Sequence, residues 1–139
     1  MTHKITTTWK GGMVFDSDNP SNHHVLMDTI VEGKERQGLS PKAMMLSSLA
    51  GCSGLDVVSI LEKMKVEVDD FKMEVEGELT EEHPKYYKTV WVTYHFTGTD
   101  LNEEKINRAV QLSVEKYCGV MEMFRQFADV EIDIKFHNK

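Results

Sequence analysis

The chain has 139 residues, 40% of them hydrophobic and 28% charged, which is typical of one compact folded domain. Its net charge is −7 and its Lys and Arg residues are spread among acids, so nucleic acid is not expected as a partner. No unbroken apolar run approaches the roughly 20 residues that cross a bilayer, and the first residues lack the apolar core of a signal peptide, so we expect a cytoplasmic protein with no membrane contact.

The first forty residues are predicted to form β structure. Two short strands flank Gly11-Gly12, a pair of residues typical of a hairpin turn, and residues 23–31 alternate as a third strand. A polar loop containing Gly33 and Gly38 separates this region from the next element.

A helix is predicted to begin at Ser40-Pro41, because Ser is a favoured N-cap and Pro is favoured at the first helical position. One face then repeats at steps of three and four residues, which is the spacing of an amphipathic helix. The residues of this face are Leu46, Leu49, Ser53, Val57, Ile60, Leu61 and Met64. Gly51 is a possible point at which this helix breaks.

The second half of the chain alternates strands and a helix. Residues 67–80 and 86–98 are predicted to be two longer antiparallel strands joined by a turn, and residues 130–137 alternate as a last strand. Between them, residues 101–127 repeat with helical spacing, with Asp100 as the expected N-cap. The face of this second helix holds Ile106, Val110, Ser113, Tyr117, Met121 and Phe124.

The resulting order is βββ-α-ββ-α-β. It predicts an α+β fold with mostly antiparallel sheets, two central helices and a single domain over residues 1–139.

The two cysteines, Cys52 and Cys118, each stand next to a glycine in a helical, methionine-rich segment. If the first helix breaks at Gly51, Cys52 lies at a helix N-terminus, where free N–H groups lower the pKa of a thiol. That geometry would offset the cost of about 1 kcal/mol that a glycine adds inside a helix. The alternative interpretation is that both cysteines are small buried hydrophobes and that glycine lets two helices pack closely. Both interpretations are open on the pattern alone.

The segments "SPKAMMLSSLAGCSGLDVVSILEKM" and "VEKYCGVMEMF" together resemble the OsmC/Ohr family of cysteine-based proteins that reduce organic peroxides, and most closely its less characterised OsmC-like branch. The resemblance covers nearly the whole chain. It implies an intertwined homodimer whose active sites are built from both chains.

The resemblance also implies a function, that of a thiol-dependent peroxidase (an organic hydroperoxide reductase) without a cofactor. Cys52 would attack the small-molecule peroxide and Cys118 would resolve the sulfenic acid as a disulfide, which a thiol or dithiol reductant would then reduce. Four methionines are near the cysteines in the sequence and form either an apolar pocket for an alkyl peroxide or ordinary core packing. They are Met44, Met45, Met121 and Met123.

The sequence departs from the family pattern at the groups that activate the attacking thiol. Lys42 and Ala43 stand where peroxidase members carry a glutamate, and the N-terminal strands offer Lys10 in place of an arginine. Among the arginines, Arg36 is the best placed substitute.

Two further groups bear on the same question. Arg125 lies two helical turns after Cys118. Asp56 shares the helix face of Cys52, where its charge would raise the thiol pKa unless it pairs elsewhere. These departures leave open a non-peroxidase OsmC-like redox or small-molecule-binding protein, or purely structural cysteines.

Metal and phosphate chemistry have little support in the sequence. None of the six histidines forms a metal-ligand spacing with a cysteine or acid, and no phosphate-binding glycine loop is present. Adjacent His23 and His24 are expected to point to opposite faces of a strand. We therefore expect neither a metal nor a cofactor.

Overall fold

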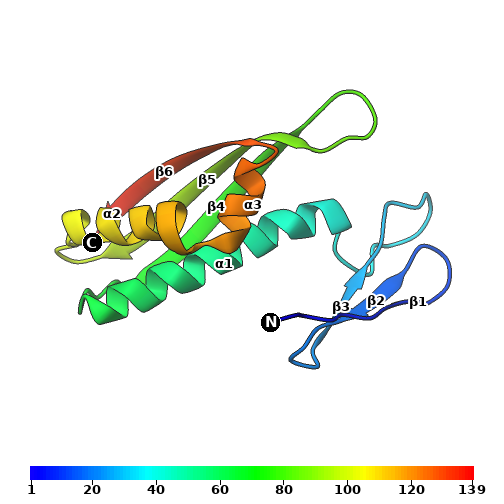
Figure 1. Cartoon of the computed structure of the whole chain (residues 1–139), viewed down its shortest axis with the longest axis horizontal. Coiled ribbons are helices and arrows are strands. Elements are labelled where there is room, and N and C mark those ends of the chain that lie inside the picture. Colours follow the sequence, from blue (N-terminus) through cyan, green and yellow to red (C-terminus); the bar gives the residue numbers. More distant parts are fainter. The chain divides into compact units, whose positions relative to one another are not determined.

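The computed structural model describes residues 1–139 and has the predicted α+β architecture (Figure 1). The predicted order of strands and helices is confirmed, except that the second helical stretch is divided into three pieces. The elements are β1 (Thr7–Trp9), β2 (Phe15–Asp18), β3 (His24–Met27), α1 (Pro41–Lys63), β4 (Asp70–Leu79), β5 (Tyr87–Gly98), α2 (Glu103–Leu112), the π-helix η1 (Ser113–Tyr117), α3 (Gly119–Arg125) and β6 (Asp129–Asn138). The chain forms two compact units, Met1–Met45 and Leu46–Lys139, which are described separately below.

The first unit holds a three-stranded antiparallel sheet in the order β1-β2-β3. The predicted hairpin lies between β1 and β2, where the N–H of Lys10 donates to the carbonyl of Val14 at 2.9 Å. Gly11 and Gly12 have φ values of 97° and 54°, a region of backbone space that favours glycine. The glycine pair is therefore required by the turn.

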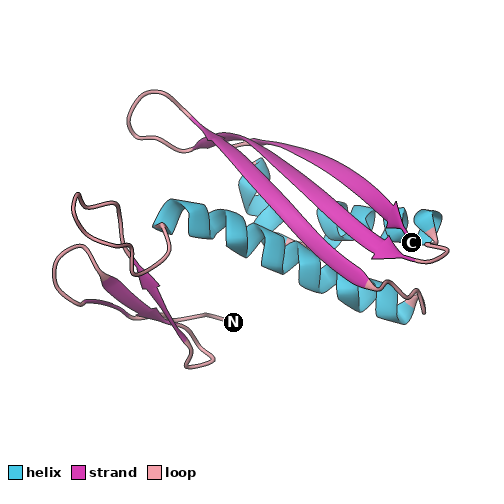
Figure 2. Ribbon diagram, turned by 180° about the vertical axis from the view of Figure 1, so that it is seen from behind, coloured by secondary structure: helices cyan, strands magenta, loops and turns pink.

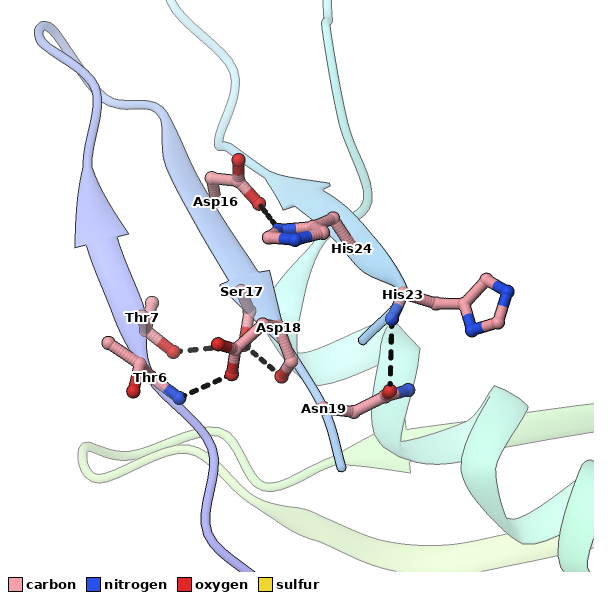
Figure 3. Close-up of polar contacts among 8 residues, drawn as sticks. All are labelled: Thr6, Thr7, Asp16, Ser17, Asp18, Asn19, His23 and His24. Carbon is pink, nitrogen blue, oxygen red and sulfur yellow. Dashed lines mark hydrogen bonds and ion pairs between the residues drawn. The ribbon is translucent and has the colours of Figure 1, made fainter. Parts of the chain in front are cut away.

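Side-chain hydrogen bonds join neighbouring strands of this sheet (Figure 3). The hydroxyls of Thr7 and Ser17 lie 2.9 Å apart between β1 and β2, and His24 Nδ1 lies 3.0 Å from Asp16 Oδ1 between β3 and β2. Figure 3 also shows the rings of His23 and His24 pointing apart, although only His24 belongs to β3 and His23 precedes it.

Helix α1 begins at Pro41 as predicted, and the N–H of Met44 donates to the carbonyl of Ser40 at 2.8 Å. The predicted break at Gly51 is wrong, because α1 is one continuous helix from Pro41 to Lys63. Its buried positions occur on both sides of the glycine, so packing holds the helix together across it. They are Leu49, Ser53, Val57 and Leu61.

By length and composition, α1 is also apolar enough to cross a bilayer, contrary to the expectation from the sequence. Core helices of folded domains have the same length and composition. About a fifth of the apolar window of α1 is buried inside this chain.

The second unit is built on the sheet β4-β5-β6, with the helices along one of its faces (Figure 2). Strand β5 pairs antiparallel with β4 and parallel with β6, because the chain crosses over through α2, η1 and α3 before it returns as β6. Alternate residues of β5 face the helices and are buried, namely Val90, Val92, Tyr94 and Phe96. Burying a side chain of this size contributes about 1.5–3 kcal/mol, so this face fixes the helices that carry the candidate site.

The predicted second helix begins later than expected and is interrupted. Asn102 is the N-cap of α2, with its side chain accepting from the N–H of Lys105 at 3.1 Å. Asp100 is therefore not the cap; it has a φ of 52°, whereas an N-cap residue typically has β-region angles. After α2, the π-helix η1 ends at Cys118, where α3 begins.

Candidate active site

The two cysteines belong to the same unit of the structure although they are 66 positions apart in sequence. Cys52 lies in the middle of α1 and is half-buried, and Cys118 lies between η1 and α3 and is 3% exposed. The thiol of Cys52 lies close enough to Cys118 to raise the pKa of the Cys118 thiol. The fold thus brings both predicted thiols together.

The helix-end position that the sequence suggested for Cys52 is occupied by Cys118. Because α1 does not break at Gly51, Cys52 has no helix N-terminus beside it. Cys118 is instead the N-cap residue of α3, and its sulfur accepts a hydrogen bond from the N–H of Met121 at 3.3 Å. The expectation for Cys52 was wrong in this respect.

The surroundings of Cys118 favour its neutral thiol. The pKa of Cys118 is raised from 9.0 to about 11, mainly by burial, whereas the N–H of Met121 acts in the opposite direction. The neighbouring Cys52 thiol and the charge of Asp56 contribute smaller parts of the same rise. Cys118 therefore carries its proton at neutral pH.

A chain of buried hydroxyl groups lies next to the cysteines, and the sequence analysis did not assign it a role. The hydroxyl of Ser53 lies 2.6 Å from that of Tyr94 and 2.8 Å from that of Ser113, and the Ser113 hydroxyl donates to Asp56 Oδ2 at 3.1 Å. Both serines and Tyr94 are fully buried. The only signal in the sequence was that Ser53 and Ser113 fall on the otherwise apolar faces of their helices.

Asp56 therefore pairs with Ser113, which is the outcome that the sequence analysis left open for it. Asp56 also lines a cavity of about 390 Å³ between α1 and the α2–η1 segment. Ile60 and Lys63 of α1 and Leu112 of α2 also line it. A carboxylate, an ammonium group and apolar carbon share this opening, so it suits a small amphipathic molecule.

Arg36 belongs to the first unit, where it binds the buried carboxylate of Asp28. Arg36 Nε donates to Asp28 Oδ1 at 2.7 Å, and the N–H of Gln37 donates to Asp28 Oδ2 at 2.7 Å. The Gln37 hydrogen bond, followed by that of Arg36, lowers the pKa of Asp28 below 3.8. The guanidinium of Arg36 is thus engaged by a carboxylate of its own unit.

Arg125 is also engaged. Its Nη1 donates to the carbonyl of Val114 in η1 at 2.6 Å, and its Nε donates to Glu122 at 3.1 Å. Arg125 therefore braces the π-helix from its exposed side. The first turn of α1 holds no acidic residue, as the sequence predicted.

The four methionines near the cysteines do not share one environment. Met121 is fully buried in the core, whereas Met45 and Met123 are exposed. No group of three or more His, Cys, Asp or Glu side chains is arranged to hold a metal ion.

The sequence model of the OsmC-like protein family matches residues 33–133 of the chain. The chain belongs to the OsmC family. Protein YhfA of Escherichia coli K12 is 36% identical over 122 residues, which are 88% of this chain and 89% of YhfA.

Solved structures also resemble this chain over nearly its whole length. The crystal structure of a hypothetical protein from Aquifex aeolicus has a TM-score of 0.88 at 28% identity, covering 100% of this chain and 98% of the other. An organic hydroperoxide resistance protein from Legionella pneumophila has a TM-score of 0.69 at 19% identity, covering 97% of each chain, which shows the shared fold.

Proposed function

We propose that this OsmC family member is a thiol-dependent peroxidase that reduces organic hydroperoxides with Cys52 and Cys118. The observation that carries the proposal is the proximity of the two thiols, seen in the effect of Cys52 on the pKa of Cys118, since a redox pair needs its sulfurs within reach of each other. A relative of the same fold from Legionella pneumophila is an organic hydroperoxide resistance protein.

Cys52 is assigned the attacking role because it is the more accessible sulfur and because Cys118 holds its proton. The Cys52 thiolate attacks one peroxide oxygen, the O–O bond breaks, and the alkoxide leaves with a proton as the alcohol. The sulfur of Cys118 then attacks the sulfenic acid, the S–O bond breaks, and hydroxide leaves with the Cys118 proton as water. A thiol or dithiol reductant supplies two electrons and two protons to restore both thiols.

The proposal includes a cytoplasmic homodimer. Several apolar side chains of α1 remain exposed in the single chain, including Leu55 and Val58. A second copy would cover them, as in the assemblies of this family. Reducing conditions in the cytoplasm would also keep a free cysteine pair reduced.

Arg36 is proposed as the cation that favours the Cys52 thiolate. Its bond to Asp28 leaves further guanidinium donors for another anion, because an arginine has five N–H groups. Arg36→Gln should then slow the reaction of Cys52 with peroxide, while Lys4→Gln serves as a matched loss of an exposed charge in the same unit. Equal rates in both variants would contradict this role for Arg36.

The proposal is tested by counting thiols after stoichiometric cumene hydroperoxide or hydrogen peroxide is added to the reduced protein. We expect rapid loss of two thiols with cumene hydroperoxide, no loss in Cys52→Ser, and a trappable sulfenic acid in Cys118→Ser. Two intact thiols under excess peroxide would refute peroxidase activity. Sulfenic acid on Cys118 in place of Cys52 would reverse the assigned roles.

The alternative function is a redox or small-molecule-binding protein of the same fold that does not reduce peroxides. The absence of an acid in the first turn of α1 favours it, because that turn carries the activating glutamate in peroxidase members. The same thiol count decides between the two functions.

A further inference from the structure

Ser113 is the first residue of η1, and it contacts α1 at Ser53, next to Cys52. Its hydroxyl lies 2.8 Å from the hydroxyl of Ser53 and 3.3 Å from the Ser53 carbonyl. Ser53 follows Cys52 directly in the chain. One serine of η1 is thus attached to the turn of α1 that carries the first thiol.

The Ser113 hydroxyl has two acceptors within reach, Asp56 Oδ2 and the Ser53 carbonyl. When it donates to Asp56, Ser53 can donate to Ser113 and Tyr94 can donate to Ser53, so that each proton is used once. Hydrogen bonds aligned in this way strengthen one another in a buried setting. A buried hydroxyl left without a partner would cost about 1–3 kcal/mol, so the geometry of η1 on α1 is tightly specified.

The π-helical turn connects Ser113, which is hydrogen-bonded to α1, with the second thiol. The N–H of Cys118 donates to the carbonyl of Ser113 at 2.8 Å, across five residues. In an α-helix, residues five apart are separated by about 140° around the axis, whereas a π-turn places one nearly above the other.

The burial of η1 agrees with this geometry. Ser113 and Cys118 are buried, while residues 115–117 between them are exposed. Arg125 binds the Val114 carbonyl from the exposed side and completes the support of the turn.

We propose that Ser113, held by Ser53 and Asp56, is a positioning residue that sets the sulfur of Cys118 against that of Cys52. It touches neither substrate nor the reacting sulfurs; it acts through the turn that ends at Cys118. The inference deepens the proposed function and rests on its pairing of Cys52 with Cys118. It predicts that the effective concentration of the two thiols toward each other depends on one hydroxyl.

The test uses diamide, an azo compound that takes two electrons and two protons from a pair of thiols and leaves them as a disulfide. The rate at which the Cys52–Cys118 disulfide forms is measured by mass spectrometry. The effective concentration of the two thiols toward each other is measured at equilibrium in a glutathione redox buffer. Both measurements are independent of any reaction with peroxide. Ser113→Ala should reduce both quantities about tenfold, the effect of losing one well-placed hydrogen bond.

Matched variants separate positioning from general destabilisation. Ser59→Ala removes an exposed serine from α1, the helix that Ser113 contacts, and should leave both quantities unchanged. Ser113→Thr retains the hydroxyl and should recover most of the effect, and Asp56→Asn retains an acceptor oxygen and should be milder than Asp56→Ala.

The outcomes distinguish this inference from the proposed function. A wild-type effective concentration in a folded Ser113→Ala variant, or no Cys52–Cys118 disulfide with diamide in the wild type, overturns the inference. A Ser113-dependent disulfide with diamide, together with thiols inert to cumene hydroperoxide, supports the inference and refutes the peroxidase.

Discussion

The titration of Cys118 is the sharpest consequence of the site geometry. Its pKa rises from 9.0 to about 11, mainly because the thiol is buried. Two pKa units correspond to a 100-fold smaller thiolate fraction at neutral pH, about one molecule in 10⁴ at pH 7. The folded state holds this proton more tightly than the unfolded state does. The free energy of unfolding is therefore at its full value below pH 9 and decreases as the pH rises from 9 toward 11.

The assay is the pH dependence of alkylation by iodoacetamide, resolved for each cysteine by peptide mass spectrometry. Limited access slows alkylation of Cys118 at every pH, whereas the midpoint of the pH profile reports the thiol itself. In Cys52→Ser the midpoint should fall below that of the wild type, because the neighbouring Cys52 thiol raises the pKa. Asp56→Asn should lower it as well. A wild-type midpoint at or below 9 would show that burial does not control this thiol.

Two further predictions concern the other positions discussed above. Gly51→Ala should raise the free energy of unfolding by about 1 kcal/mol if no partner covers α1 there, because an added Cβ meets nothing within 4 Å. If the variant is instead less stable and no longer sediments as a dimer, a partner helix packs against Gly51. The carboxyl carbon of Asp28 should titrate in NMR with a midpoint below 3.8, because Gln37 and Arg36 stabilise its charge. These contacts should therefore weaken only as the pH falls through that lower midpoint. A midpoint above 3.8 would contradict the hydrogen bonds to Gln37 and Arg36.

Much of the fold was predictable because its signals are local. The Gly11-Gly12 turn, the helix start at Pro41 and the alternation of β5 each depend on neighbouring residues, and each is confirmed. The error at Asp100 has the same origin, since Asn102 is an equally good cap and only the backbone angles decide between them.

The site was less predictable because its geometry depends on contacts between distant residues. Spacing alone treated Ser53 and Ser113 as ordinary members of apolar faces, although they bond to each other across 60 positions. The sequence gives no sign of the π-turn either, because the pattern of residues 113–117 is compatible with an α-helix and with a π-helix. Gly51 suggested a break in α1, but local helix propensity is a weak force where buried residues flank the glycine on both sides.

In the proposed reaction, the different settings of the two thiols give them different roles. A resolving thiol that ionised too readily would compete for peroxide with the attacking one, and a buried thiol with a raised pKa does not. Such a thiol attacks slowly unless its partner is held close, so proximity must replace ionisation as the source of rate. The Ser113 anchor and the π-turn provide that proximity through the backbone. A variant that lowers the pKa of Cys118 without moving it should therefore form the disulfide faster, but by less than the gain in its thiolate fraction, because nucleophilicity falls with the pKa.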